Sequence, residues 1–165
     1  MVHLGRIGVN RQALLEVARR VVGRAISQVW YLHSDPNWPN GYRMDVDLHE
    51  PDFAVLLRLD DGFTVGIAWE LIGEIETIAC AVGQFTDFAS DPRLKAPMSD
   101  VSSVAPYPSL LGRPVTAVET LVSEEIPFGV RFAFDSQCVT FALGEWVGDQ
   151  VTPSADSLVV SFGDI

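Results

Sequence analysis

The chain has 165 residues, of which 48% are hydrophobic and 20% charged, which excludes a disordered protein and predicts a single domain over residues 1–165. No apolar run is long enough to span a membrane, and Glu16, Arg19 and Arg20 interrupt the stretch that a signal peptide would need. The net charge of −11 argues against nucleic acid or membrane partners and favours a basic partner, with solubility as the simpler explanation.

The first predicted element is a helix over residues 10–22. Asn10 is expected as its N-cap and Gly23 as its stop. Its apolar face, at helical spacing, consists of Leu14, Val17, Ala18 and Val21. Alternating apolar residues then predict strands over residues 25–32, 53–59, 63–69 and 76–82. The sequence Asp60-Asp61-Gly62 predicts a tight turn between the second and third of these strands.

Residues 84–109 differ in composition from the rest of the chain. They are rich in proline and serine, which predicts a surface linker with one helical turn over residues 85–88. Four further strands are predicted over residues 115–122, 128–134, 138–143 and 158–162, with a turn at residues 135–137.

The two groups of strands repeat the same pattern. Residues 22–29 match residues 111–118 at a shift of 89, residues 53–60 match 128–135 at 75, and residues 77–83 match 157–163 at 80. We expect an internal duplication, with one unit over residues 22–83, a linker over 84–109 and a second unit over 110–165. The predicted fold is α+β and mostly β, an N-terminal helix followed by two antiparallel four-stranded units. These units form either two sheets or one closed barrel.

A Gly-Arg pair precedes the first strand of each unit, as Gly23-Arg24 and as Gly112-Arg113. The arginines are candidates for binding a ligand in both units. The simpler interpretation is that glycine supplies a backbone turn while arginine pairs with a carboxylate such as Glu119 or Asp60. Asp60 and its counterpart Asp135 are expected to form turns.

The first unit has 14 extra residues between its first two strands, the difference between the shifts of 89 and 75. They fall within residues 33–47, a stretch called here the insertion. Aromatic residues surrounded by acids are typical of contact surfaces for a basic protein. The predicted contact residues are Asp35, Trp38, Tyr42, Asp45, Asp47 and Glu50. The alternative is a long hairpin loop whose Trp38 folds back onto the core.

Two other functions have weaker sequence support. Asp45, Asp47 and His49 alternate as metal ligands on a strand would, although such a run is also typical of a solvent-facing strand. A small-ligand pocket between the units, lined by Trp30, Trp69 and Trp146, is the other alternative. The chain has no Gly-rich phosphate loop and no nucleophile motif, so no cofactor, metal or catalytic residue is expected.

The two cysteines, Cys80 and Cys138, lie in apolar strand-like runs, which is typical of buried thiols in a reducing compartment. With no signal peptide recognised, this predicts a cytoplasmic location. The sequence does not define an oligomeric state.

The repeated elements also carry a resemblance. The pattern Leu-x-Gly-Arg-x-hydrophobic-Thr-x-Val, a later strand ending in Phe-Asp, and the ending Asp-Ser-Leu-Val-Val-Ser-Phe resemble small acidic actinobacterial proteins with two β-rich repeats. Some proteins of this size and acidity are immunity proteins encoded beside toxins. The resemblance implies a cytoplasmic, non-catalytic inhibitor of a basic toxin, and it assigns no functional residue.

Overall fold

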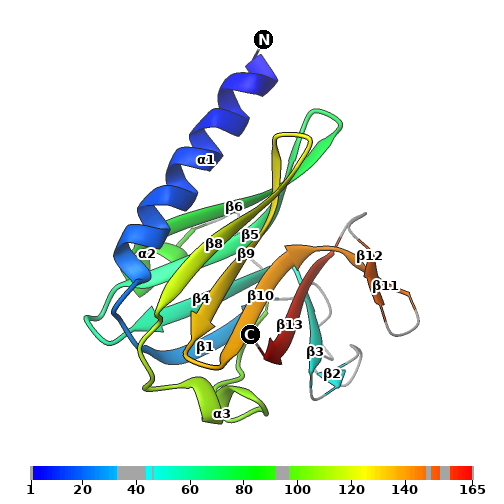
Figure 1. Ribbon diagram of the computed structural model, residues 1–165. Coiled ribbons are helices and arrows are strands. Elements are labelled where there is room, and N and C mark those ends of the chain that lie inside the picture. Colours follow the sequence, from blue (N-terminus) through cyan, green and yellow to red (C-terminus); the bar gives the residue numbers. More distant parts are fainter. Residues whose placement is uncertain are drawn as a thin grey trace.

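The computed structural model describes residues 2–32, 44–45, 47–91, 97–147, 150–152 and 157–164. Two antiparallel sheets pack on each other, and helix α1 (Val2–Val21) runs along one side of them (Figure 1). The mostly-β α+β class predicted from the sequence is therefore confirmed, as two sheets and not as a closed barrel.

The first sheet, called sheet 1, has five strands in the order β6-β5-β4-β1-β7. These strands are β1 (Ile26–Leu32), β4 (Ala54–Leu59), β5 (Thr64–Ile72), β6 (Ile75–Gly83) and β7 (Met98–Asp100). The short helix α2 (Phe85–Ala89) follows β6, where one helical turn is predicted.

The second sheet, called sheet 2, has six strands in the order β2-β3-β13-β10-β9-β8. They are β2 (Met44–Asp45), β3 (Leu48–Asp52), β8 (Ala117–Ser123), β9 (Ile126–Phe134), β10 (Gln137–Leu143) and β13 (Leu158–Asp164). A separate hairpin consists of β11 (Glu145–Val147) and β12 (Gln150–Thr152). The helix α3 (Tyr107–Leu110) precedes β8.

Each sheet contains four strands that neighbour one another in chain order, β1-β4-β5-β6 in sheet 1 and β8-β9-β10-β13 in sheet 2. Their registers also correspond. Val29 pairs with Leu57 in sheet 1. Val118 lies 89 residues after Val29, and Phe132 lies 75 residues after Leu57. These two residues pair with each other in sheet 2. The four-stranded antiparallel order expected for each unit is thus present in both sheets.

A short junction joins the beginnings of the two sheets. The Gly23 amide donates a hydrogen bond to the Val115 carbonyl at 2.8 Å, and the Gly112 amide donates one to the Ile26 carbonyl at 3.0 Å. The two bonds join equivalent positions of the repeat. Gly112 lies 89 residues after Gly23, and Val115 lies 89 residues after Ile26. Between them, residue 25 forms an antiparallel bridge with its own counterpart, residue 114. The junction is therefore reciprocal.

Glycine is required at both ends of this junction. Gly23 has φ of +84° and Gly112 has φ of +80°, in the left-handed region that side chains with a Cβ rarely adopt. Each glycine also follows a helical turn, because Leu110 ends α3 as Val21 ends α1. The turn predicted for both Gly-Arg pairs is confirmed, and it redirects the chain from a helix into a first strand.

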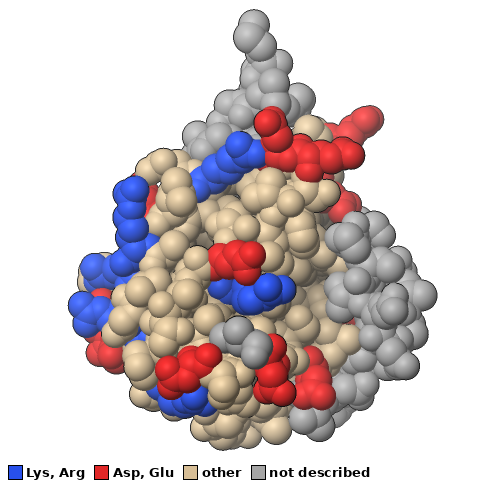
Figure 2. Space-filling view, in the orientation of Figure 1, with Lys and Arg blue, Asp and Glu red and all other residues tan. Residues whose placement is uncertain are grey.

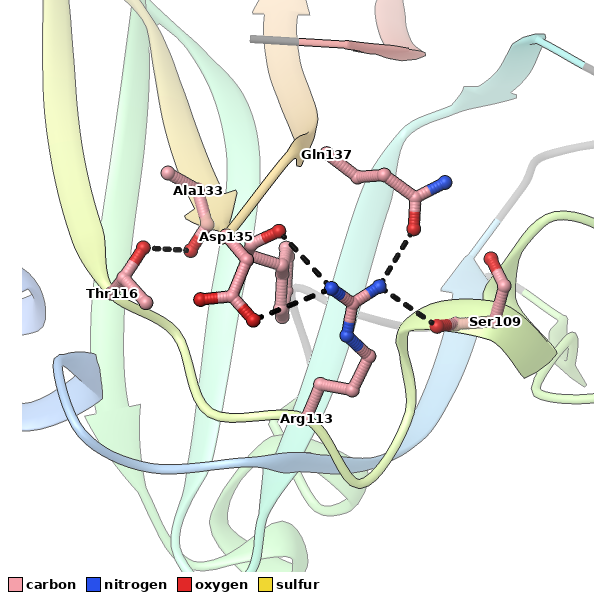
Figure 3. Close-up of polar contacts among 7 residues, drawn as sticks. Ser109, Arg113, Thr116, Ala133, Asp135 and Gln137 are labelled. Atoms are coloured by element: carbon pink, nitrogen blue, oxygen red, sulfur yellow. Dashed lines mark hydrogen bonds and ion pairs between the residues drawn. The ribbon is translucent and has the colours of Figure 1, made fainter.

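Each arginine contacts a turn of its own sheet, the β4–β5 turn for Arg24 and the β9–β10 turn for Arg113. Arg24 lies 3.6 Å from the Asp61 carboxylate, and Arg113 lies 3.6 Å from the Asp135 carboxylate. Figure 3 shows the Arg113 guanidinium between Asp135 and the side chain of Gln137, to which it donates at 2.8 Å. A carboxylate partner is confirmed, but the predicted Asp60 and Glu119 are wrong.

The predicted surface linker is wrong over its second half. Val101 is 1% exposed, Tyr107 is 2% exposed and Leu110 is 4% exposed, and all three belong to the core between the sheets. Strand β7 extends sheet 1 by pairing with β1. Proline and serine content predicts a loop locally, but it does not reveal that Val101 and Tyr107 of that loop, with Leu110 directly after it, belong to the core between the two sheets.

Helix α1 is longer than predicted and begins before residue 10. Asn10 is not its N-cap but lies within the helix, and its amide donates to the Glu70 carboxylate at 3.0 Å. Leu14, Val17 and Val21 are buried on the predicted face. None of the helices among the described residues has the length and apolar character needed to cross a membrane.

Both cysteines are free thiols, as the sequence predicts. Cys80 is buried, and burial raises the pKa of its thiol to about 12. Cys138 is only half-buried, on β10, so the expectation of two buried thiols holds for Cys80 alone.

We predict that Gly112→Ala and Gly23→Ala each lower the free energy of unfolding by about 1–2 kcal/mol, the usual cost of a Cβ in the left-handed region. Urea denaturation measures this change. Gly163→Ala is the matched control, because a Cβ there would meet its nearest neighbour at an ordinary 3.9 Å. Equal losses for all three variants would contradict the role of the junction.

Candidate functional site

The segment between β1 and β4, which contains the insertion, leaves sheet 1 and returns to it at a single point. Leu32 ends β1 and Phe53 precedes β4, and the Phe53 amide donates to the Leu32 carbonyl at 3.2 Å. Between these residues the chain contributes β2 and β3 to the edge of sheet 2, where β3 pairs with β13. The stretch predicted as an insertion therefore crosses from one sheet to the other.

The predicted contact residues are described only in part. Asp35, Trp38 and Tyr42 lie outside the described residues, and Asp45 is described only as part of β2. Asp47 is exposed, and its carbonyl accepts a hydrogen bond from the Phe162 amide at 2.9 Å. Glu50 is half-buried and accepts one from the Ser157 hydroxyl at 2.9 Å. These two residues lie at the base of the insertion and fix it to sheet 2.

His49 anchors the same base from inside the protein. It is 1% exposed, its Nε2 lies 3.1 Å from the Ala105 carbonyl oxygen, and its Nδ1 lies 2.8 Å from the Tyr31 hydroxyl. A carbonyl oxygen can only accept, so Nε2 donates and Nδ1 accepts the Tyr31 proton. The Tyr31 oxygen then accepts from the Tyr107 hydroxyl, at 2.6 Å. This chain of hydrogen bonds connects sheet 1, sheet 2 and the residues before α3.

The environment of His49 suits a neutral ring. Tyr107 and Phe162 meet the imidazole edge-on, with ring centres 6.0 Å and 5.0 Å away. Burial lowers the pKa of His49 to about 4, and burial raises the pKa of Tyr31 and of Tyr107. Both ring nitrogens already have protein partners, so His49 is not available to the metal site considered for residues 45–49. Among the described residues, no group of three His, Cys, Asp or Glu side chains could hold a metal ion.

A small cleft lies beside the base of the insertion. It has a volume of about 180 Å³. Its lining includes two carboxylate residues, Asp47 and Asp164, together with Gln137 and Phe162 of sheet 2 and Leu110 of α3. Asp164 is exposed near the end of the chain, and Asp47 leads into β3. The cleft is therefore a small acidic recess next to the predicted contact residues.

A larger groove lies on the outer face of sheet 1. It has a volume of about 500 Å³, within the usual range of ligand sites. Its floor is built from rows of cross-strand neighbours. Ala54 pairs with Ala68 and Ala68 with Ala79 in one row, while Gly66 pairs with Ala81 in the next. Because these side chains are small, the sheet surface is hollow at this place.

The helix α2 forms one wall of this groove. Phe88 approaches the sheet so closely that a Cβ on Gly66 would lie 2.6 Å from its ring. Phe85 stacks on Trp30 with ring centres 4.6 Å apart, and the Arg58 guanidinium lies 5.0 Å from the Phe85 ring. Among the described residues, α2 therefore covers the outer face of sheet 1 around Trp30 and Gly66, and the groove lies beside it.

The tryptophan pocket predicted between the units is wrong. The space between the sheets is filled by the main core, and Trp30 belongs to a separate cluster on the outer face of sheet 1. Trp69 packs against the main core and also lines the outer groove. The side chain of Trp146 lies outside the described residues. Sequence reasoning missed the groove, whose only local signal is the small residues on alternating positions of β5 and β6.

The charged side chains are unevenly placed. Figure 2 shows basic residues gathered on the side of α1 and carboxylates at the end where two hairpins turn in Figure 1. Glu124 and Glu125 form one of these turns, both with positive φ, at 49° and 68°. The hairpins lie side by side because the Thr77 hydroxyl of β6 donates to the Pro127 carbonyl of β9 at 2.8 Å.

Comparison with protein-family models, with curated proteins and with solved structures found no match for this chain.

We predict that His49 makes the protein less stable in mild acid. The unfolded chain takes up a proton near the ordinary histidine pKa of about 6.5, whereas folded His49 does so only near pH 4, so stability falls as the pH falls between these values. The expected loss is about 1.4 kcal/mol per pH unit.

Urea denaturation of the natural protein and of His49→Gln, from about pH 7 to about pH 5, measures this effect. The carboxylates titrate in both proteins, so the difference between the two curves belongs to His49. Parallel curves would contradict the prediction.

Proposed function

We propose that this protein is a non-catalytic, cytoplasmic binding protein that holds a basic protein partner, as immunity proteins hold toxins. The observation that carries the proposal is the imbalance of charge. The chain has 22 acidic and 11 basic side chains. Six of the basic side chains contact their own chain: Arg11, Arg20, Arg24, Arg58, Arg113 and Arg131. The excess of acidic side chains gives the chain a net charge of −11, which attracts a basic partner.

The insertion is the proposed contact surface. It lies in the segment between Leu32 and Phe53, which are joined by a backbone hydrogen bond, and the neighbouring residues His49 and Glu50 are held by the hydrogen bonds described above. The cleft that Asp47 and Asp164 line could receive a basic side chain of the partner. Aromatic residues of the insertion, Trp38 above all, would supply the apolar part of the contact.

We also infer that the two sheets derive from one duplicated unit. The reciprocal junction supports this, and so does the register of the later strands. Ile67 pairs with Cys80 in sheet 1. In sheet 2, Phe141 pairs with Val160, which follows Cys80 by the predicted shift of 80. On this view, features present in both sheets are scaffold, and features found once are candidates for function.

The proposal predicts that Trp38→Ala and Asp45→Ala/Asp47→Ala each weaken binding to a basic partner at least tenfold, as loss of an interface anchor does. Isothermal titration calorimetry measures this, with the basic product of a neighbouring gene as the partner.

The matched control is Glu16→Ala/Glu74→Ala, which removes two exposed carboxylates outside the insertion and should change the affinity by less than about threefold. Equal losses for both double variants would show that only net charge matters and would reject the insertion as the site. Absence of binding to any basic product of a neighbouring gene would reject the proposed function.

A further inference from the structure

Among the described residues, the outer faces of the two sheets differ at the place of the groove. The corresponding row of sheet 2 is polar, because Glu119 pairs with Arg131 and Arg131 with Thr140. Arg131 donates to the Glu119 carboxylate at 3.1 Å and to the Thr140 hydroxyl at 3.1 Å. A polar row is what an outer sheet face in water normally carries.

In sheet 1 the same row consists of Trp30, Leu56, Gly66 and Ala81. The large residues Trp30 and Leu56 lie on β1 and β4 and pack with Phe85 and Phe88 of α2. On β5 and β6 the small residues take their place: Gly66 lies beside the Phe88 ring, and Ala81 is exposed. The hollow on the outer surface of the sheet is therefore deeper over β5 and β6 than over β1 and β4, and its floor is apolar. Such a face on one sheet, opposite a polar face on the other, indicates a binding surface.

The groove is acidic at its margins. Glu70 follows Ala68 on the same face of β5, and Asp91 follows α2, whose Phe88 lies over Gly66. Gly66 and Glu70 are four residues apart on one strand, or about 13 Å. The side-chain amide of Asn10, on α1, donates a hydrogen bond to the Glu70 carboxylate at 3.0 Å. Carboxylates that line an otherwise apolar groove are complementary to a ligand with an apolar body and a positive charge.

We propose that this groove binds a small amphiphilic cation. The apolar body of the ligand lies along Ala68, Ala79 and Ala81 against the ring of Phe88, and its ammonium group contacts the Glu70 carboxylate. An anionic ligand of the same shape is rejected by Glu70 and Asp91. This site is separate from the insertion and does not depend on the protein partner.

Three probes that share an eight-carbon skeleton and differ in their head group test the proposal: n-octylammonium, n-octanol and n-octanoate. Binding is measured on the full chain by calorimetry and by shifts of backbone amide resonances. We expect octylammonium to shift the amides of Gly66, Ala68 and Ala81 and to bind at least tenfold more tightly than octanoate, with octanol between them. Glu70→Gln should weaken octylammonium at least fivefold and leave octanol unchanged.

Ala81→Leu fills the groove and should abolish binding, and Ala79→Leu provides a second, independent block. The matched control is Ser161→Leu, the counterpart of Ala81 on sheet 2, which should bind like the natural protein. Dispersed amide resonances from sheet 2 verify that each variant is folded. Equal affinity for octanoate, binding unaffected by both groove-filling variants, or no binding of octylammonium would overturn the proposal.

Discussion

The structure depends on the reciprocal backbone contact between the starts of the two sheets. Gly112 donates to Ile26 at the start of β1, Gly23 donates to Val115 just before β8, and both glycines have a left-handed backbone. Because the chain leaves each glycine directly into a first strand, this contact sets where both sheets begin. Arg24 and Arg113 then tie each beginning to a turn of the same sheet. The core forms between two sheets positioned in this way.

The proposed functions lie at two places where the sheets differ from each other. One is the segment between β1 and β4, which contains the insertion and adds β2 and β3 to the opposite sheet. The other is the outer face of sheet 1, where Gly66 and Ala81 stand in place of a polar row. The features that both sheets share are thereby distinguished from the two proposed binding surfaces.

Local patterns in the sequence predict the strands and turns well, because alternation and turn residues act over a few positions. The strand Ala54–Leu59 and the glycines at residues 23 and 112 are examples. Long-range contacts were not predictable in this way. Asn10 resembles an N-cap until its partner, 60 residues away, is known. Tyr107 looks like a linker residue although it is buried between the sheets, and the groove appears only when register places Ala68 beside Ala79.

The most direct test of this account is hydrogen exchange of the two junction amides. If the junction holds the sheets together, the Gly23 and Gly112 amides exchange at the same slow rate, and only when the whole protein unfolds, although both residues are exposed at the surface. Their measured free energies of opening should equal the global free energy of unfolding. Exchange of either amide at the rate of an exposed loop, while strands β4 and β9 remain protected, would contradict the account.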